Sequence, residues 1–193
     1  GRGRNLGHNG FMQHDDATAT PEVAALFAEA RAQFGFVPNL LRLMAESPAT
    51  LRGYRALGAL FQAGSFDPRE RLLIELAASV ENGCRYCTAA HTAQATGAGL
   101  AATDVAAVRA GGLPADSRGA ALVTMLRALI RQRGAVPGAE VAAFLAAGFS
   151  RAQLLELVLG IAMKTISNYT NHLVDAPLDA AVASAQPDAA SCH

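Results

Sequence analysis

The sequence lacks several features that would point to a particular partner or surrounding. Its 16 basic and 16 acidic side chains cancel, and no cluster of Lys or Arg suggests nucleic acid or an anionic lipid as a partner. No apolar run reaches the roughly 18 residues needed to cross a bilayer, and no signal peptide pattern opens the chain. We therefore expect a soluble, cytoplasmic protein that acts on a small or apolar molecule.

Cysteine is also scarce. Three cysteines in 193 residues do not form the framework of a disulfide-rich secreted protein, and a chain of this length buries a sufficient core without one. Two of them, Cys84 and Cys87, are separated by two residues. In a cytosolic protein this spacing more often binds a metal or undergoes redox chemistry, so these cysteines are the first functional candidates.

The length fits one domain, which we expect over residues 15–180. Residues 1–14 are rich in Gly, Arg and Asn, and we expect an expression remnant or a disordered N-terminus there. Residues 181–193 are rich in Ala, Ser and Pro and are expected to form a disordered tail. The side chains in these two segments that could carry chemistry are therefore set aside: His8, His14, Cys192 and His193.

Alternating runs of β-branched residues are missing, whereas apolar residues recur at intervals of three and four. This periodicity predicts an all-α domain in which Pro and Gly residues separate the helices. The expected helices span residues 21–35, 38–46, 48–64, 67–82, 84–96, 103–110, 117–131, 138–147 and 150–172. The Cys-x-x-Cys motif therefore opens a central helix.

The start of this helix suggests thiol chemistry. A thiolate at a helix N-terminus is stabilised by free N–H groups and the helix dipole, which lower its pKa. The spacing of Cys84 and Cys87 permits an intrachain disulfide, and His91, one turn further, could take a thiol proton. Three interpretations stay open at this point: a redox pair, which we favour, a zinc site that includes His172, and two inert buried cysteines.

An imidazole that accepts a proton works better beside a carboxylate. Glu75 interrupts an apolar run, where a carboxylate is expected to be partly buried and therefore paired or functional. Glu81 is closer to the cysteines but lies near a turn. We treat both as candidates for orienting His91.

Three blocks of the sequence together resemble one protein family. The chain resembles the alkylhydroperoxidase D and carboxymuconolactone decarboxylase-like proteins, and in particular their peroxidase-related branch. The central block, which contains both cysteines and His91, is the most specific of the three. The blocks are residues 35–39 with 47–48, residues 81–91, and residues 168–172 with 177–179.

The resemblance implies an all-helical homo-oligomer, as a dimer, trimer or hexamer, that reduces hydroperoxides without a bound cofactor or metal. It implies that Cys87 attacks the peroxide, that His91 assists its deprotonation, and that Cys84 closes the disulfide. An external dithiol would then restore both thiols. His172 is a secondary candidate from the third block.

The chain departs from the family at one position. In alkylhydroperoxidase D proteins a glutamate stands twelve residues before the first cysteine, where this chain has Leu72. Glu75 follows three residues later on a neighbouring part of the same helix face, so it could substitute for this glutamate, and the sequence does not decide which glutamate, if any, does so. Decarboxylase members generally lack the Cys-x-x-Cys motif, so its presence argues against lactone decarboxylation. The alternative to a peroxidase is a non-enzymatic redox sensor or zinc-binding protein that uses the same side chains.

Overall fold

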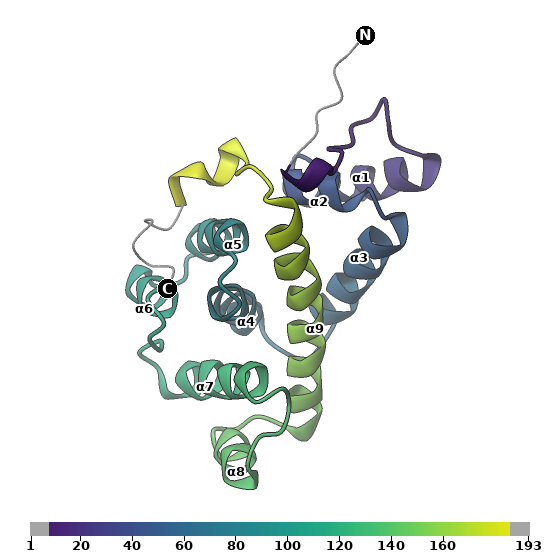
Figure 1. The fold of residues 1–193 in the computed structure, drawn as a ribbon. Coiled ribbons are helices and arrows are strands. Elements are labelled where there is room, and N and C mark those ends of the chain that lie inside the picture. Colours follow the sequence, from purple (N-terminus) through teal and green to yellow (C-terminus); the bar gives the residue numbers. More distant parts are fainter. Residues whose placement is uncertain (1–7, 186–193) are drawn as a thin grey trace.

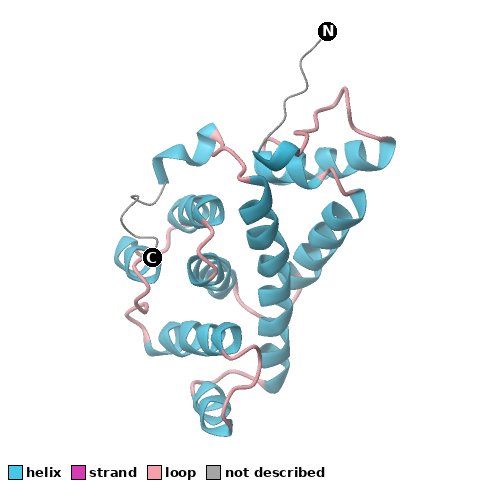
Figure 2. Ribbon diagram, viewed as in Figure 1, coloured by secondary structure: helices cyan, strands magenta, loops and turns pink. Residues whose placement is uncertain are grey.

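A computed structural model describes residues 8–185, in which every regular element is a helix. The longest helix, α9 (Arg151–Val174), runs through the length of the molecule. Helix α3 (Pro48–Gln62) lies along one side of it, and α4 (Pro68–Glu81) and α5 (Arg85–Gly97) lie on the other (Figures 1 and 2). The predicted all-α fold is confirmed.

The remaining helices surround this centre. Helices α4 and α5 pack against each other, and α4 also contacts α9 and the helices Ala102–Arg109 and Ser117–Arg131. The predicted helix limits agree with the observed ones to within two residues. The other elements are η1 (His8–Gly10), α1 (Pro21–Phe34), α2 (Asn39–Met44), α6 (Ala102–Arg109), α7 (Ser117–Arg131), α8 (Gly138–Ala146) and η2 (Ala180–Ala185).

Helix limits could be predicted because they are marked by capping residues. Pro begins α1, α3 and α4 at the first helical position, where no N–H is needed. Asp67 and Glu70 form a reciprocal capping box at the start of α4. Gly35 ends α1 with a φ of 82°, a conformation that favours glycine.

The connection from α4 to α5 brings the two cysteines into place. Gly83 turns the chain with a φ of 67°, and the Cys84 backbone N–H donates to the Ser79 carbonyl at 2.9 Å. Cys84 then occupies the N-cap of α5, a position usually held by Ser, Thr, Asp or Asn. Its sulfur accepts the Cys87 backbone N–H at 3.4 Å.

The core consists of two groups of buried side chains. One lies around α4, α7 and α9, and the other joins α1 and α2 to the start of α5. Tyr54 of α3 packs against both groups. Where α9 crosses α3, Gly160 lies so close to the Phe61 ring that a Cβ would be 2.7 Å from Cε2. Gly160 precedes Lys164 by about one turn, so this close contact fixes the position of α9 near Lys164.

The ordered domain is longer than predicted at both ends. Residues 8–14 were expected to lie outside it, but they are hydrogen-bonded to it: Asn9 Nδ2 donates to the Leu173 carbonyl at 2.8 Å, and the His14 backbone N–H to the Arg42 carbonyl at 3.1 Å. At the other end η2 continues to residue 185. Cys192 and His193 lie outside the described residues.

Among residues 8–185, no single helix has both the length and the apolar character needed to cross a membrane. Helices α8 and α9 reach that length and composition only when taken together, and their axes are bent by 110°. Length and composition alone are weak evidence for a span, because core helices share them.

Candidate active site

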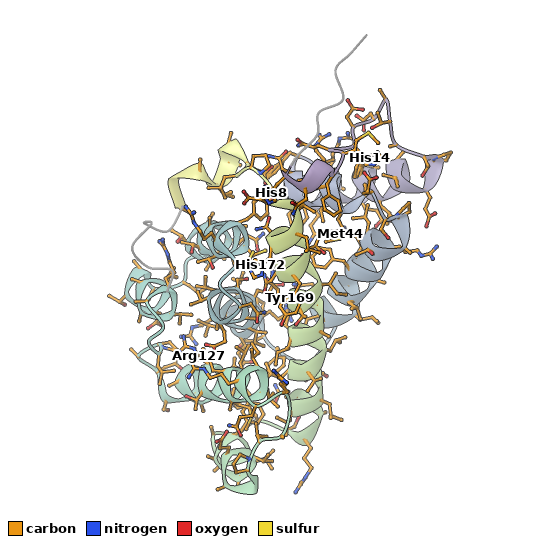
Figure 3. All side chains as sticks on the ribbon, in the orientation of Figure 1. His8, His14, Met44, Arg127, Tyr169 and His172 are labelled. Atoms are coloured by element: carbon orange, nitrogen blue, oxygen red, sulfur yellow. The ribbon has the colours of Figure 1, made fainter. Side chains whose placement is uncertain are left out.

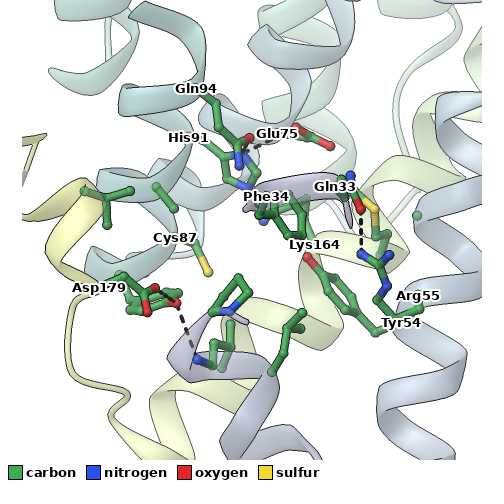
Figure 4. A pocket seen from close by; sticks show the side chains of 18 of the residues that line it. Gln33, Phe34, Tyr54, Arg55, Glu75, Cys87, His91, Gln94, Lys164 and Asp179 are labelled. Atoms are coloured by element: carbon green, nitrogen blue, oxygen red, sulfur yellow. Dashed lines mark hydrogen bonds and ion pairs between the residues drawn. The ribbon is translucent and has the colours of Figure 1, made fainter. Parts of the chain in front are cut away.

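The Cys-x-x-Cys motif borders a cavity of about 590 Å³. Side chains from α1, α2, α3, α4, α5, α9 and the segment before and within η2 line it. Most of the walls are apolar or aromatic, and polar groups gather around Cys87 and His91 (Figure 4). The apolar and aromatic lining residues include Phe34, Phe36, Leu40, Leu41, Tyr54, Tyr86 and Met163.

The two cysteines have different positions relative to this cavity. Both are reduced and buried, with 1% of Cys84 and 3% of Cys87 exposed. Cys87 lines the cavity, whereas Cys84 lies behind it at the helix start. Cys87 is therefore the thiol that a molecule in the cavity would meet.

The groups around the two cysteines favour a thiolate at Cys87 and a neutral thiol at Cys84. A hydrogen bond from the Cys84 thiol, the charge of Lys164, the neighbouring His91 ring and the Asn168 amide outweigh burial and lower the Cys87 pKa to about 5. The same hydrogen bond, together with burial and the adjacent anion, raises the pKa of Cys84. The pair thus loses one proton readily and retains the other.

His91 links this thiol to a chain of polar side chains. Its Nε2 lies 2.6 Å from the Lys164 Nζ, and its Nδ1 lies 3.3 Å from the Glu75 Oε2 and 3.0 Å from the Gln94 Oε1. An ammonium group can only donate, so we assign the lone pair to Nε2 and the ring proton to Nδ1. His91 therefore accepts from Lys164 and donates towards Glu75 or Gln94.

Glu75 takes the place predicted for it beside His91. Its side chain is almost completely buried, and Oε1 accepts a hydrogen bond from Gln62 Nε2 at 3.3 Å. Burial alone would raise the Glu75 pKa, but His91, Lys164 and Arg71 together hold it below its ordinary value. The carboxylate therefore stays charged and can orient the imidazole.

Lys164 is a residue of this site that the sequence analysis missed. It is the only lysine of the chain, and only 1% of it is exposed. Burial would lower its pKa, but Cys87, Tyr54 and Glu75 raise it above its ordinary value. A single lysine in the apolar sequence of α9 was the available signal, because a charged side chain is rarely buried without a partner.

Two further side chains complete the surroundings of Cys87. Burial raises the pKa of Tyr54, so its phenol remains a neutral donor at the cavity wall. Asn168 is fully buried, and its Oδ1 accepts from Asn82 Nδ2 at 2.9 Å. Its Nδ2 has no hydrogen-bond partner among the described residues, while the amide helps to lower the Cys87 pKa.

A second hydrogen-bonded group fixes the C-terminal segment against the cavity. The Tyr86 hydroxyl donates to Asp179 Oδ2, and Asp179 Oδ1 accepts the Asn39 backbone N–H at 2.9 Å. Both Tyr86 and Asp179 line the cavity. This group joins one residue from each of the three blocks that carry the family resemblance, namely Asn39, Tyr86 and Asp179.

Two of the predicted site residues lie elsewhere. Glu81 pairs with Arg131 of α7, with Oε1 at 2.5 Å from Nε, and with Arg127 at 3.7 Å. His172 is exposed on α9 and stacks on Tyr169 with ring centroids 6.2 Å apart (Figure 3). Neither residue lines the cavity.

The zinc alternative gains no support from this geometry. Within residues 8–185, no group of three or more His, Cys, Asp and Glu side chains is arranged to hold a metal ion. His172, which was the possible fourth ligand, does not line the cysteines' cavity and borders a separate hollow with Gly83 and Asn171.

The comparisons with known proteins agree on family and fold. Residues 48–130, which include both cysteines and His91, match the model of the Carboxymuconolactone decarboxylase family. A search of curated proteins gives no match.

Solved structures share the fold at low sequence identity. An uncharacterized peroxidase-related protein from Silicibacter sp. TM1040 has a TM-score of 0.78 at 17% identity, over 94% of this chain and 96% of that chain. Another, described as an alkylhydroperoxidase AhpD core from Ralstonia eutropha JMP134, has a TM-score of 0.79 at 20% identity, over 87% and 90%.

A third structure is the debrominase Bmp8, in a cysteine-to-alanine variant bound to 2,3,4-tribromopyrrole. It has a TM-score of 0.76 at 17% identity, over 91% of this chain and 94% of that chain. Residues 48–130 are thus similar to the carboxymuconolactone decarboxylase family, and the described residues of the chain have the all-helical fold of AhpD-like proteins.

Proposed function

We propose that this protein is a thiol-dependent peroxidase that reduces an organic hydroperoxide through the Cys84 and Cys87 pair. One observation carries the proposal: Cys87 lines an otherwise largely apolar cavity, and its pKa is lowered to about 5. A thiolate, and not a thiol, is the nucleophile in such chemistry. The cavity offers this thiolate to a molecule while keeping it away from bulk solvent.

In the first step the Cys87 thiolate attacks the terminal oxygen of the hydroperoxide. The O–O bond breaks, the sulfur is oxidised to a sulfenic acid, and the alkoxide leaves. A proton converts this alkoxide to the alcohol. Lys164 is the proton donor that the geometry favours, because its ammonium group is positively charged, lines the cavity and interacts with Cys87.

In the second step Cys84 closes the disulfide. Its sulfur attacks the Cys87 sulfur, and the hydroxide that leaves takes up the Cys84 proton to form water. The two thiols have then supplied the two electrons that the peroxide received. An external dithiol reduces the disulfide and returns both protons.

His91 and Glu75 restore the proton on Lys164. When Cys87 ionises again, its proton can reach the lysine directly or through His91 Nε2, which lies 2.6 Å from Nζ. The Glu75 carboxylate, 3.3 Å from His91 Nδ1, stabilises the imidazolium formed on the way. In this arrangement Lys164 stands between the imidazole and the substrate.

The test is a count of free thiols. The reduced protein is mixed with one equivalent of cumene hydroperoxide, and its thiols are counted by mass spectrometry. We expect both thiols of the motif to be lost to one intrachain disulfide, and we expect Cys87→Ser to remain unreactive. If both thiols of the unmodified protein remain free after this treatment, the proposal is wrong.

Extending the same assay distinguishes the proposed peroxidase from two competing functions. A redox sensor would form the disulfide but would show no repeated turnover when a dithiol is supplied. The shared fold with a debrominase makes reductive dehalogenation the other competitor. Release of bromide from 2,3,4-tribromopyrrole, with no loss of hydroperoxide, would favour that reaction instead.

The homo-oligomer implied by the family resemblance remains a proposal. Several large apolar side chains on α9 are exposed in the single chain, namely Leu155, Val158, Tyr169 and Leu173. An apolar surface of this kind is typical of contacts between subunits. Sedimentation measurements of the purified protein would give the oligomer number.

A further inference from the structure

We infer that the cavity selects a hydroperoxide that carries a carboxylate, and that Arg55 binds this carboxylate. The inference rests on the proposed function, because it names the substrate class of the same site. It starts from an arginine that has no acidic partner among residues 8–185.

Arg55 lies on α3 and lines the cavity. Its Nη1 donates to Gln33 Oε1 at 2.7 Å, and its guanidinium carbon lies 5.8 Å from the centre of the Phe34 ring. Its Nε is buried and has no hydrogen-bond partner in the described part of the chain. No carboxylate within residues 8–185 lies at ion-pair distance from it.

This arrangement differs from that of a typical surface arginine. Arg52, one turn earlier on the same helix, is largely exposed and pairs with Glu22 at 2.9 Å. The Arg55 guanidinium is instead positioned by Gln33 and Phe34, and donors remain for a ligand. A planar group with several N–H donors binds a carboxylate through two parallel hydrogen bonds, so a carboxylate is the ligand that fits.

The positions of Arg55 and Cys87 determine how the substrate would lie. Figure 4 shows the two side chains on opposite sides of the cavity, with aromatic residues between them. A substrate whose carboxylate binds Arg55 would place its apolar body against Phe34 and Tyr54 and its hydroperoxide at Cys87. Binding of the carboxylate to Arg55 therefore places the opposite end of the substrate, which carries the hydroperoxide, next to the Cys87 thiolate.

Four other charged or acidic side chains border the cavity, namely Glu29, Glu75, Lys164 and Asp179. Glu75 is engaged by His91 and Gln62, and Asp179 accepts from Tyr86 and the Asn39 backbone N–H, and neither lies at ion-pair distance from Arg55. Glu29 is exposed at the edge of the cavity, where water and salt weaken its repulsion of a carboxylate. Lys164 is a second cation, but it is engaged with His91 and lies beside the thiolate. A carboxylate bound there would block Cys87 instead of orienting a substrate.

Binding is tested without any peroxide chemistry. The probes are 4-isopropylbenzoate and its uncharged methyl ester, titrated calorimetrically into the reduced protein. The variants are Arg55→Met and Arg55→Lys, and Arg52→Met is the matched control on the same helix. We expect the acid to bind at least about tenfold more weakly to Arg55→Met, with Arg55→Lys in between and Arg52→Met unchanged.

The ester shows whether the cavity itself survives the substitution, since its affinity is expected to stay the same in every variant. Equal affinity of the unmodified protein for acid and ester, or an acid affinity that Arg55→Met leaves unchanged, would overturn the inference. A parallel turnover assay uses the para-carboxylated cumene hydroperoxide. If the acid probe binds through Arg55 but this hydroperoxide is not reduced, the proposed function fails while the carboxylate site stands.

Discussion

The Lys164 ammonium nitrogen lies 2.6 Å from Nε2 of His91. The lone pair of the imidazole is therefore used by the lysine, and the geometry adds Lys164 between His91 and the substrate. That His91 takes a thiol proton stays a prediction. Lys164 is the cation with the largest influence on the Cys87 thiolate. The histidine, in turn, connects the lysine to Glu75, which lies 3.3 Å from Nδ1.

Replacing the lysine should change the acidity of the thiol. In Lys164→Met the Cys87 pKa is expected to rise by about 1 to 3 units, because the main stabilising positive charge is lost. The ultraviolet absorbance of the thiolate, followed against pH, measures this shift. Arg151→Met removes an exposed charge from the same helix and should have no effect. An unchanged titration in Lys164→Met would show that the lysine does not stabilise the thiolate.

Glu75 and Glu81 were both candidates in the sequence, with Glu75 preferred, and replacing each by Gln tests this choice. Glu75→Gln should reduce the rate of peroxide reduction by about 100-fold, because it removes the charge that supports His91. Glu81→Gln should leave this rate unchanged but destabilise the protein by about 1 to 3 kcal/mol, since buried Arg127 loses its ion pair. The rate of peroxide reduction and the urea unfolding of both variants test these two expectations. A rate loss of the same size in both would contradict the assignment.

The reaction should depend on pH through Cys87. Because its pKa is lowered to about 5, the thiolate is lost as the pH falls through that value. The rate of Cys87 oxidation is expected to be flat above about pH 6 and to fall about tenfold for each pH unit well below 5. Stopped-flow measurements with excess hydroperoxide give this profile. A rate that keeps rising up to pH 8 would indicate an ordinary thiol.

The crossing of α3 and α9 should be sensitive to a single methyl group. Gly160→Ala places a Cβ 2.7 Å from the buried Phe61 ring and is expected to destabilise the protein by about 1 to 3 kcal/mol. Gly53→Ala in α3 meets nothing within 4 Å and should stabilise by up to about 1 kcal/mol through helix propensity. Thermal and urea unfolding compare the two. A neutral Gly160→Ala would mean that the crossing is looser than described.

The fold was predictable because its helices are separated by strong local signals. Pro21, Pro48 and Pro68 begin helices, and the observed limits follow from these positions and their caps. Residues 8–14 were missed because they are held by contacts with distant segments, such as Asn9 with Leu173. Such contacts leave no periodic pattern in the sequence.

The site was predictable only where its residues share a helix. Cys84, Cys87 and His91 are related by helical spacing, so their proximity could be expected. Lys164 and Arg55 come from α9 and α3, and only the packing of these helices brings them to the cavity. The apolar run around Glu75 favoured it over Glu81, and the structure shows why the two differ: Glu75 lies on the face of α4 that meets α5, and Glu81 on the face that meets α7.

The central claim is that Cys87 attacks the peroxide and Cys84 resolves the product. The most direct measurement uses Cys84→Ser, which cannot form the disulfide, treated with one equivalent of cumene hydroperoxide in the presence of dimedone, a reagent that traps sulfenic acids. Peptide mapping by mass spectrometry should find the dimedone adduct on Cys87. An adduct-free Cys87 that remains a free thiol, or trapping on Cys84 in the reciprocal Cys87→Ser variant, would contradict this account.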